Sequence, residues 1–569
     1  MNARLTLSYI SILVIAISLS TASQSSSARM LAAPAPLQAV PEAALPAGSL
    51  SPAQMPPQAL ITLSVAPAFI HAWATTWGGT GNTAANGIAI DHSGNIYVIG
   101  EFTGTTNFDP AGPNLSATFT SYNGTVDAYL AKFSAQGAFL WARTWGAGST
   151  ACVPVSRGCG RDSANGVVVD GADNAYVGGL FQNTVTFGND HAATSNAANG
   201  TNNIYLTKFS ADGTNQWVRA WGGKTGGEAY SVALDAAHGY VYIEGDWSTT
   251  PNTGWVDFNP GGSNGSRQNH GTYDAFLCKY ALDGTFQWVR TWGGEGYDDG
   301  PGVAVDAAGN VYVNGMYGST NINFDPNGGP GGQGYPATHS GMLYVDVFLS
   351  KFDADGTFQW VRTWGGDANG AGTTNAGGPI AIDRAGNVLI GGRFGCTTCA
   401  FNVAGSAPGT LDPNVQSNGD LDAFVAKYDG SGNRLWVKTW GGTGWDATAG
   451  LTTDVGNSVY ASAMFANTVN FGGGPVTSKG LWDAGIVRLS PDGTFQWART
   501  WGGSGQDFSA IAIDTLGNLY SAGNFQNTVD FGAGDAADTH AAHGSSDAFL
   551  SKFLDETQWH RVFSPLAIR

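Results

Sequence analysis

The stretch between residues 302 and 364 decides the fold, because it contains four short segments in succession: GVAVD (302–306), NVYVNGMY (310–317), DVFLSKF (346–352) and FQWVRTW (358–364). Each segment alternates apolar with polar residues or is rich in β-branched and aromatic residues, which indicates a β-strand. Short turns with Asp and Gly join the first segment to the second and the third to the fourth. The sequence therefore predicts a four-stranded antiparallel unit, with strands a, b, c and d.

This unit recurs seven times along the chain. The aromatic residue that closes strand d returns at intervals of 61 to 76 residues, as Trp77, Trp145, Trp221, Trp292, Trp364, Trp440, Trp501 and Phe563. A four-stranded unit buries neither face by itself, so successive units have to stack on each other. A ring leaves only short, protected strand edges. We therefore predict an all-β fold, a seven-bladed β-propeller of four-stranded antiparallel blades.

The repeats also divide the chain and raise the question of how the ring closes. They span about residues 78–145, 146–221, 222–292, 293–364, 365–440, 441–501 and 502–563. Eight d-like segments exist for seven sets of strands a to c. The N-terminal copy at 69–77 is followed by Gly-Gly, whereas the C-terminal copy at 558–563 has lost Trp-Gly-Gly. We predict that the N-terminal outer strand closes the ring, in a propeller domain at 69–563 with a tail at 564–569.

The repeated motifs resemble a known family. W-G-G-x-G-x-D, G-I-A-x-D-x-x-G-N-x-Y, F-x-x-T-x-x-F, D-A-F-x-x-K-F and D-G-T-F-Q-W-x-R-T are similar to the SBBP-type repeat, named for seven-bladed β-propellers. The resemblance covers residues 77–563. It implies a propeller from a family mostly known in secreted or cell-surface bacterial proteins without an assigned activity, so it bears on fold and compartment more than on chemistry.

The N-terminal segment indicates export. Residues 1–22 have the pattern of a signal peptide, with Arg4, an apolar run at 9–19 and small residues at 20–22. The apolar run is too short to span a bilayer. Residues 23–68 are rich in Ala, Pro and Ser, which is typical of an extended linker. We expect a secreted protein, extracellular or at the cell surface, with no membrane span after cleavage.

Charge narrows the possible partners. The chain carries 25 basic and 43 acidic residues, for a net charge of -18. Binding to nucleic acid depends on clustered Lys and Arg, so this balance excludes nucleic acid as the expected partner. A polysaccharide or a surface protein is the expected partner.

The cysteines suggest loop disulfides. Cys152 and Cys159 bracket one long connection, and Cys396 and Cys399 form C-T-T-C in another. In an exported protein both pairs are expected to be local disulfides. A redox motif needs a helix N-terminus and a zinc site needs a second pair, and neither context is visible. Cys278, in strand c of the third unit, has no evident partner and is expected to be a buried apolar residue.

Repetition separates scaffold from candidate site. A residue found in every unit, such as the strand-c pair Asp127 and Lys132, is expected to form inter-strand ion pairs. The a-to-b and c-to-d turns are short and share one face, whereas the long, variable d-to-a and b-to-c connections share the other, where binding residues concentrate. The ligand-binding candidates on that face are Tyr297, Asp298, Trp445, Asp446, Trp482 and Asp507.

Each candidate has a structural alternative. The aromatic residues suit stacking on sugars or packing against a protein surface, but ordinary loop packing explains them equally well. The acidic residues after Trp-Gly-Gly, which also include Asp162, Glu228 and Asp299, could form a ring that holds a cation. Alternatively, each accepts backbone N–H groups from its own loop.

Two functional hypotheses remain. The first is a non-catalytic binding or structural scaffold. The second is a secreted carbohydrate-active enzyme, a lyase or hydrolase, with acidic residues at the channel mouth. Such an enzyme needs unlike, unrepeated groups around one cleft. No catalytic residue and no metal-ligand set is predicted, and Ca²⁺ is the one cofactor considered.

Overall fold

The computed structural model divides into two units, Met1–Ala66 and Pro67–Arg569. It describes residues 69–555 except 111, 113–116, 148–159, 189–190, 195–200, 223–225, 249–253, 261, 320, 326–334, 337–344, 367–375, 396–398, 401–414 and 533. The predicted signal peptide, linker and C-terminal tail therefore lie outside the described residues. Within the described residues, no helix has the length and apolar character needed to cross a membrane.

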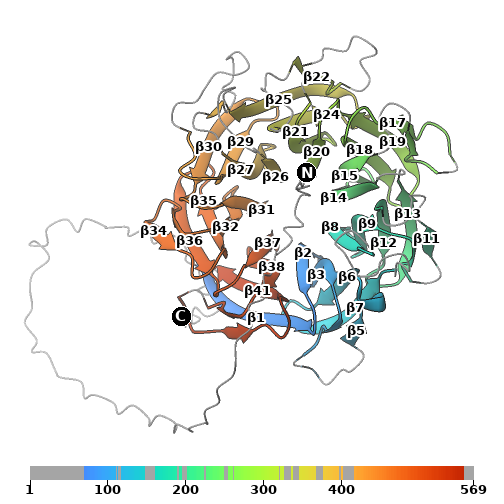
Figure 1. Ribbon diagram of the computed structural model, residues 1–569. Helices are drawn as coiled ribbons and strands as arrows, with labels where there is room; N and C mark the ends of the chain where they lie inside the picture. Colours follow the sequence, from blue (N-terminus) through green and yellow to red (C-terminus); the bar gives the residue numbers. More distant parts are fainter. Residues whose placement is uncertain are drawn as a thin grey trace, which may run out of the picture. The chain divides into compact units, whose positions relative to one another are not determined.

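The described strands form seven four-stranded antiparallel blades (Figure 1). In the order a, b, c, d, blade 1 is β2 (Thr83–Ile90), β3 (Ile96–Phe102), β6 (Asp127–Phe133) and β7 (Phe139–Trp145). Blade 2 is β8 (Ser163–Val169), β9 (Ala175–Phe181), β12 (Asn203–Phe209) and β13 (Asn215–Trp221). Blade 3 is β14 (Gly226–Asp235), β15 (Tyr240–Ser248), β18 (Asp274–Ala281) and β19 (Phe286–Trp292). Blade 4 is β20 (Asp298–Val305), β21 (Val311–Tyr317), β24 (Asp346–Phe352) and β25 (Phe358–Gly366).

The remaining blades repeat the pattern. Blade 5 is β26 (Ala376–Ile382), β27 (Val388–Phe394), β29 (Asp422–Tyr428) and β30 (Arg434–Trp440). Blade 6 is β31 (Ala447–Thr453), β32 (Val459–Phe465), β35 (Asp483–Leu489) and β36 (Phe495–Trp501). Blade 7 is β37 (Phe508–Ile513), β38 (Leu519–Phe525), β41 (Asp547–Asp555) and β1 (Phe69–Gly79). The a strands lie innermost around a common axis and the d strands outermost (Figure 1). The predicted seven-bladed propeller is confirmed.

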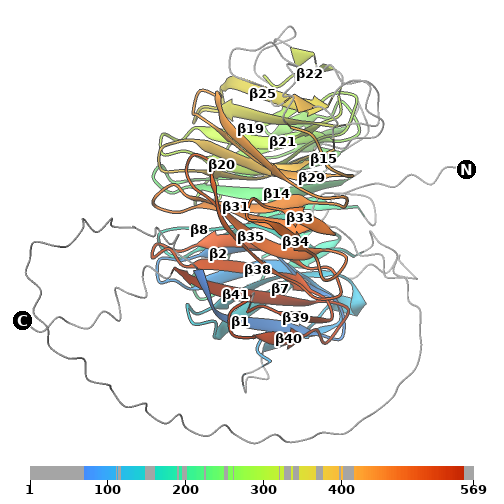
Figure 2. The ribbon, with the colours of Figure 1, turned by 90° about the vertical axis from the view of Figure 1, so that its left-hand side faces the viewer.

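Closure by the N-terminal strand is also confirmed. Strand β1 pairs antiparallel with β41, from Phe69 opposite Asp555 to Trp77 opposite Ala548. Figure 2 shows β1 running beside β41 at the closing blade. The competing segment at 558–563 lies outside the described residues.

Six b-to-c connections contain a short antiparallel ribbon or a remnant of one. The paired strands are β4 (Thr105–Asn107) with β5 (Thr118–Thr120), β10 (Thr184–Thr186) with β11 (Ala192–Thr194), β16 (Trp255–Asp257) with β17 (Ser266–Gln268), β22 (Asn321–Ile322) with β23 (Tyr335–Pro336), β33 (Thr468–Asn470) with β34 (Pro475–Thr477), and β39 (Thr528–Asp530) with β40 (Thr539–Ala541). In blade 5, β28 (Cys399–Ala400) pairs instead with the end of β25. The sequence predicts variable loops for these segments. Their pairing into short ribbons corrects that prediction.

The blades are joined by aromatic packing. The Trp that ends strand d in one blade stacks on the last aromatic residue of strand c in the next, as in Trp221 on Tyr280 and Trp292 on Phe352, with ring centroids 5.6 Å apart in both pairs. Trp77 of β1 makes the same contact with Phe133 of blade 1, at 4.9 Å. The core is therefore a series of seven clusters between blades. Burial of both faces of each blade supplies most of the stability.

Repeated cations add hydrogen bonds across the same seams. Lys132 Nζ donates to the Ala211 carbonyl of the next blade's c-to-d turn at 3.3 Å, and Lys552 Nζ closes the circle by donating to Ala135 at 3.2 Å. The ion-pair partner predicted for Lys132 is wrong. Lys132 pairs with Asp91 of the a-to-b turn at 3.0 Å, because the carboxylate of Asp127 accepts the backbone N–H of Tyr122 at 2.9 Å.

The cysteine predictions are mostly outside the described residues. Nothing is described for Cys152, Cys159 and Cys396, or for the side chain of Cys399. Cys278 is free and fully buried, as expected.

Closure by β1 predicts an asymmetry between the chain ends. Trp77→Ala removes a buried indole from the seam of blades 7 and 1 and should lower the free energy of unfolding by about 3–5 kcal/mol. A chain ending at Asp555 should unfold like the full chain. Denaturant titration followed by tryptophan fluorescence measures both. The opposite result, a neutral Trp77→Ala with a destabilising truncation, would show that the C-terminal segment closes the ring.

Candidate functional site

We call the face that carries the d-to-a and b-to-c connections the loop face. Its rim is built from parallel bridges between blades, each linking the residue before strand c of one blade to a residue just before strand a of the next. Described bridges join Asn82 to Ser546, Val126 to Arg161, Tyr273 to Tyr297, Leu421 to Trp445 and Trp482 to Gln506. The side chains at these matched positions differ from blade to blade. The residue types on the rim are therefore not fixed by the repeat.

The predicted aspartates lie just inside this rim and bind backbone. Asp298, Asp446 and Asp507 are fully buried. Asp446 accepts N–H groups of Gly442 and Ala466 at 2.9 and 3.1 Å, and Asp507 accepts that of Gly503 at 2.9 Å. Burial raises the pKa of each to about 7. Their oxygens tie the d-to-a loop to the end of strand b, so we leave these three out of the proposed binding surface.

The predicted aromatic residues fall into two groups. Trp445 and Trp482 of blade 6 stack on each other with ring centroids 6.2 Å apart and planes at 25°. The Arg393 guanidinium lies 5.0 Å from the Trp445 ring, and Phe508 packs on Trp482 at 5.9 Å. We call Trp445 and Trp482 the Trp pair. Tyr297 lies elsewhere on the rim, with its ring 5.3 Å from that of Tyr273.

Strand b supplies the residues that the sequence analysis missed. Positions are counted from the first residue of strand b, except in blade 3, where β15 begins one residue early and the count starts at Val241. The second position is Tyr in six blades and Leu389 in the other, and these side chains are core. The fourth and sixth positions vary. In blade 3 they are Glu244 and Asp246, whereas the same positions in blade 2 are Gly178 and Leu180. Comparing the seven copies position by position would have revealed these two acids.

Blades 3 and 4 bring four carboxyl groups together. Glu228 is the cross-strand partner of Asp246. Asp299 of β20 lies close enough to raise the pKa of both Asp246 and Glu244. Gly300 makes room for them, because a Cβ there would overlap Oε1 of Glu244.

Two tyrosines complete this group. A β-bulge makes Tyr230 an extra residue between Ala229 and Ser231, and such a bulge can re-aim a side chain. The hydroxyls of Tyr230 and Tyr297 each donate to Oδ2 of Asp246 at 3.2 Å. We call Glu228, Glu244, Asp246 and Asp299, with Tyr230 and Tyr297, the acid–tyrosine cluster.

One cation borders the cluster. Arg161 lies 3.1 Å from Glu101 of blade 1 and 3.5 Å from Glu228, and both carboxylates help to keep the pKa of Arg161 above its usual value against the effect of burial. Asn165 Nδ2 donates to Glu228 at 3.0 Å. The positive charge of Arg161 is thus shared between Glu101 and Glu228, at one end of the cluster.

Two carboxyl groups of the cluster have oxygens that receive no hydrogen bond. Both oxygens of Glu244 and Oδ1 of Asp299 are buried without a hydrogen-bond partner. Burial, and then the neighbouring carboxyl groups, raise the pKa of Glu244 and Asp246 well above the usual range. The same two causes raise that of Asp299 to about 8. Among the described residues, no group of three or more His, Cys, Asp or Glu has an arrangement that could hold a metal ion.

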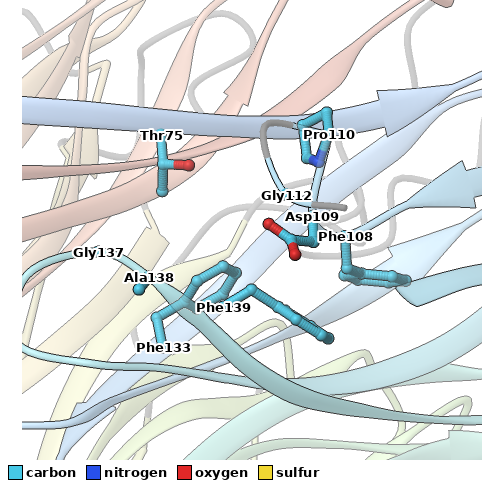
Figure 3. Close-up of a pocket in the computed structure, with 9 residues that line it drawn as sticks. All are labelled: Thr75, Phe108, Asp109, Pro110, Gly112, Phe133, Gly137, Ala138 and Phe139. Carbon is cyan, nitrogen blue, oxygen red and sulfur yellow. The ribbon is translucent and has the colours of Figure 1, made fainter. Parts of the chain in front are cut away.

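A cavity of about 330 Å³ lies elsewhere, at the seam of blades 7 and 1. Figure 3 shows the Asp109 carboxylate beside the phenyl rings of its wall, with Thr75 of β1 opposite. The wall residues Phe133 and Phe139 recur in blade 4 as Phe352 and Phe358. Because these rings belong to the repeat, the cavity is a weaker candidate than the loop face.

Comparisons with known proteins assign the chain to no family. No family model matches the chain. The chain is 23% identical over 440 residues to the uncharacterized WD repeat-containing protein L264 of Acanthamoeba polyphaga mimivirus, an alignment that covers 68% of this chain and 30% of that protein. It therefore spans less than a third of that relative.

Solved structures are similar only at a distance. Sqt1 from Chaetomium thermophilum has a TM-score of 0.37 at 8% identity, over 86% of this chain and all (100%) of that one. The ulvan lyase of polysaccharide lyase family PL25 has a TM-score of 0.38 at 12% identity, over 82% and 96%. Similarity at this level carries no argument about activity.

The raised pKa values predict how stability depends on pH. A carboxyl group whose pKa is higher in the folded chain holds a proton that the unfolded chain releases above about pH 4. Its contribution to stability is therefore full in acid and is lost as the pH rises through the folded-state pKa. The melting temperature should fall between about pH 5 and pH 9.

A substitution isolates the cluster's share of this effect. Glu244→Gln should raise the melting temperature at pH 8.5 by more than at pH 5.5, because it removes one of these protonation sites. Glu295→Gln, an exposed glutamate near the loop face, should change neither value. Calorimetry at both pH values measures this, and an equal effect of Glu244→Gln at the two would contradict the assignment.

Proposed function

We propose that the protein is a secreted, non-catalytic binding scaffold that meets a saccharide on its loop face. One observation carries the proposal: in a molecule whose core repeats seven times, unlike polar and aromatic side chains gather at the loop-face ends of the inner strands. Binding residues are expected where a rigid scaffold allows variation. The predicted signal peptide at 1–22 supports a place outside the cell.

The Trp pair favours a saccharide as the ligand. Trp445 and Trp482 belong to blade 6 and are themselves rim positions. The matched residues described in other blades are Asn82, Arg161, Tyr297 and Gln506 for Trp445, and Ser546, Val126, Tyr273 and Leu421 for Trp482. Both indoles are only partly buried. Their stacking, with Arg393 on one side and Phe508 on the other, fixes the indoles while leaving part of each uncovered. A rigid aromatic surface beside a hydrogen-bond donor suits a sugar ring, which has apolar faces and a polar edge.

The alternative is a secreted carbohydrate-active enzyme, and the acid–tyrosine cluster is what favours it. A carboxyl group with a raised pKa, such as that of Asp299, is suited to general acid catalysis. We prefer binding because these carboxyl groups belong to the neighbouring blades 3 and 4 and lie side by side. Acid–base cleavage of a glycosidic bond needs two carboxyl groups on opposite sides of that bond.

The binding proposal predicts which tryptophan matters. On a glycan array, followed by calorimetry with the glycan that binds best, Trp445→Ala in the full chain should weaken binding about tenfold or more, which corresponds to about 1.4 kcal/mol. Leu516→Ala is the matched control, because Leu516 is 63% exposed on an a-to-b turn of the opposite face.

Two results would overturn the proposal. One is the absence of binding to any glycan, and the other is equal affinity of the wild-type chain and Trp445→Ala. Release of shortened sugar chains by the wild-type protein, abolished in Asp299→Asn, would favour the enzyme instead.

A further inference from the structure

The acid–tyrosine cluster has a composition that the fold does not require. At the position of Glu244 the other blades carry Ile99, Gly178, Asn314, Gly391, Ser462 and Ala522. At the position of Asp246 three of them carry Leu180, Met316 and Met464. Blades therefore form equally well without these acids. Burying carboxyl groups side by side costs stability unless a partner of opposite charge compensates them.

In two other blades the position of Glu244 supplies a hydrogen-bond donor to the next blade. In blade 4, Asn314 Nδ2 donates to the Gly378 carbonyl of the next blade at 3.2 Å, and in blade 6, Ser462 Oγ donates to the Ser509 carbonyl at 2.7 Å. Glu244 places a carboxyl group there instead, and neither of its oxygens has a partner. Asp299 Oδ1 is a third buried acceptor without a donor. These three oxygens therefore have no hydrogen-bond partner among the described residues, although Tyr230 and Tyr297 donate to other oxygens of the cluster.

Arg161, the cation that borders the cluster, forms no hydrogen bond with the carboxyl oxygens that lack partners. Arg161 contacts Glu101 and Glu228, which leaves Asp246, Asp299 and Glu244 on the blade 4 side of the cluster. Tyr230 and Tyr297 donate to Asp246, but a hydroxyl donor carries no charge. The rings of Tyr273 and Tyr297 stand together on the rim above, 5.3 Å apart.

This set of groups selects a kind of cation. Tyrosine faces attract cations, and carboxyl oxygens accept N–H donors. A metal ion is disfavoured because the described part of the chain contains no group of acidic, His or Cys side chains arranged to hold one. A primary ammonium group brings a positive charge and three N–H donors, which carboxyl oxygens without partners can accept. A quaternary ammonium group brings the charge without the donors.

We propose that the acid–tyrosine cluster binds the primary ammonium group of an alkylamine, either a free diamine or a lysine side chain. Glu244 and Asp299 are fully buried, so the ligand has to be a slim, unbranched chain that ends in the ammonium group. The site uses residues of blades 3 and 4 only. It is independent of the saccharide proposed for the Trp pair on blade 6.

The test is calorimetric titration of the full chain at fixed ionic strength with cadaverine, with Nα-acetyl-lysine amide and with tetramethylammonium. The ionic strength is held constant because a chain with a net charge of -18 attracts any cation at low salt. Cadaverine should bind at least tenfold more tightly than tetramethylammonium. Binding of the lysine amide at a similar affinity would indicate a peptide as the source of the amine, and its failure to bind would indicate a free amine; both results support the site.

Variants separate the site from general charge. Asp246→Asn should weaken cadaverine binding at least tenfold, and Tyr297→Phe, which removes only a hydroxyl, should weaken it less while keeping the fold. Glu295→Gln and Trp445→Ala should leave it unchanged. Equal binding of cadaverine and tetramethylammonium, no binding of cadaverine by a folded wild-type chain, or displacement of cadaverine by an equimolar amount of Ca²⁺ would each overturn the proposal.

Discussion

Each blade has two apolar faces, and this constraint produces the rest of the molecule. Strand b of blade 3 places Ile243 against the preceding blade and Tyr242 against the next. Strand d adds Trp292, which stacks on strand c of that next blade. A blade with one neighbour would leave one of these faces in water. Since the hydrophobic term dominates folding, every blade needs two neighbours, and a ring is the arrangement that gives two to all seven.

Because the core is set by repetition, departures from the repeat are informative. Asn314 and Ser462 occupy equivalent positions and make equivalent hydrogen bonds to the next blade, so these residues are explained by the scaffold. Glu244 at the same position makes none. Trp445 and Trp482 stand out in the same way, because no other described bridge position of the rim carries a Trp. A tandem repeat in this way provides its own internal control, with six other blades as the reference for each one.

The fold could be predicted in detail because its signals are local. Strand spacing, turn residues and the Trp-Gly-Gly at 77–79 gave the blade count and the closing strand. What sequence reasoning missed depends on contacts between segments far apart in the chain. The pairing of Lys132 with Asp91 crosses two turns of one blade, and the cluster needs Asp299 of β20 to face Asp246 of β15. For the aspartates at 446 and 507, the alternative that each binds N–H groups of its own loop agrees with the bonds from Gly442 and Gly503. The further bond from Ala466 to Asp446 becomes visible only once strands a and b are placed.

The closing strand also determines the order in which the blades can fold. Six blades consist of strands that follow one another in sequence, so each can form as soon as its own residues have been synthesised. Blade 7 cannot, because Phe69 at its outer edge pairs with Asp555, near the other end of the chain. The earliest strand of the domain must wait, unpaired, until the last one emerges. Formation of the ring is therefore the slow, non-local step of folding, and an incomplete chain keeps two open seams, one on blade 1 and one on the last blade made.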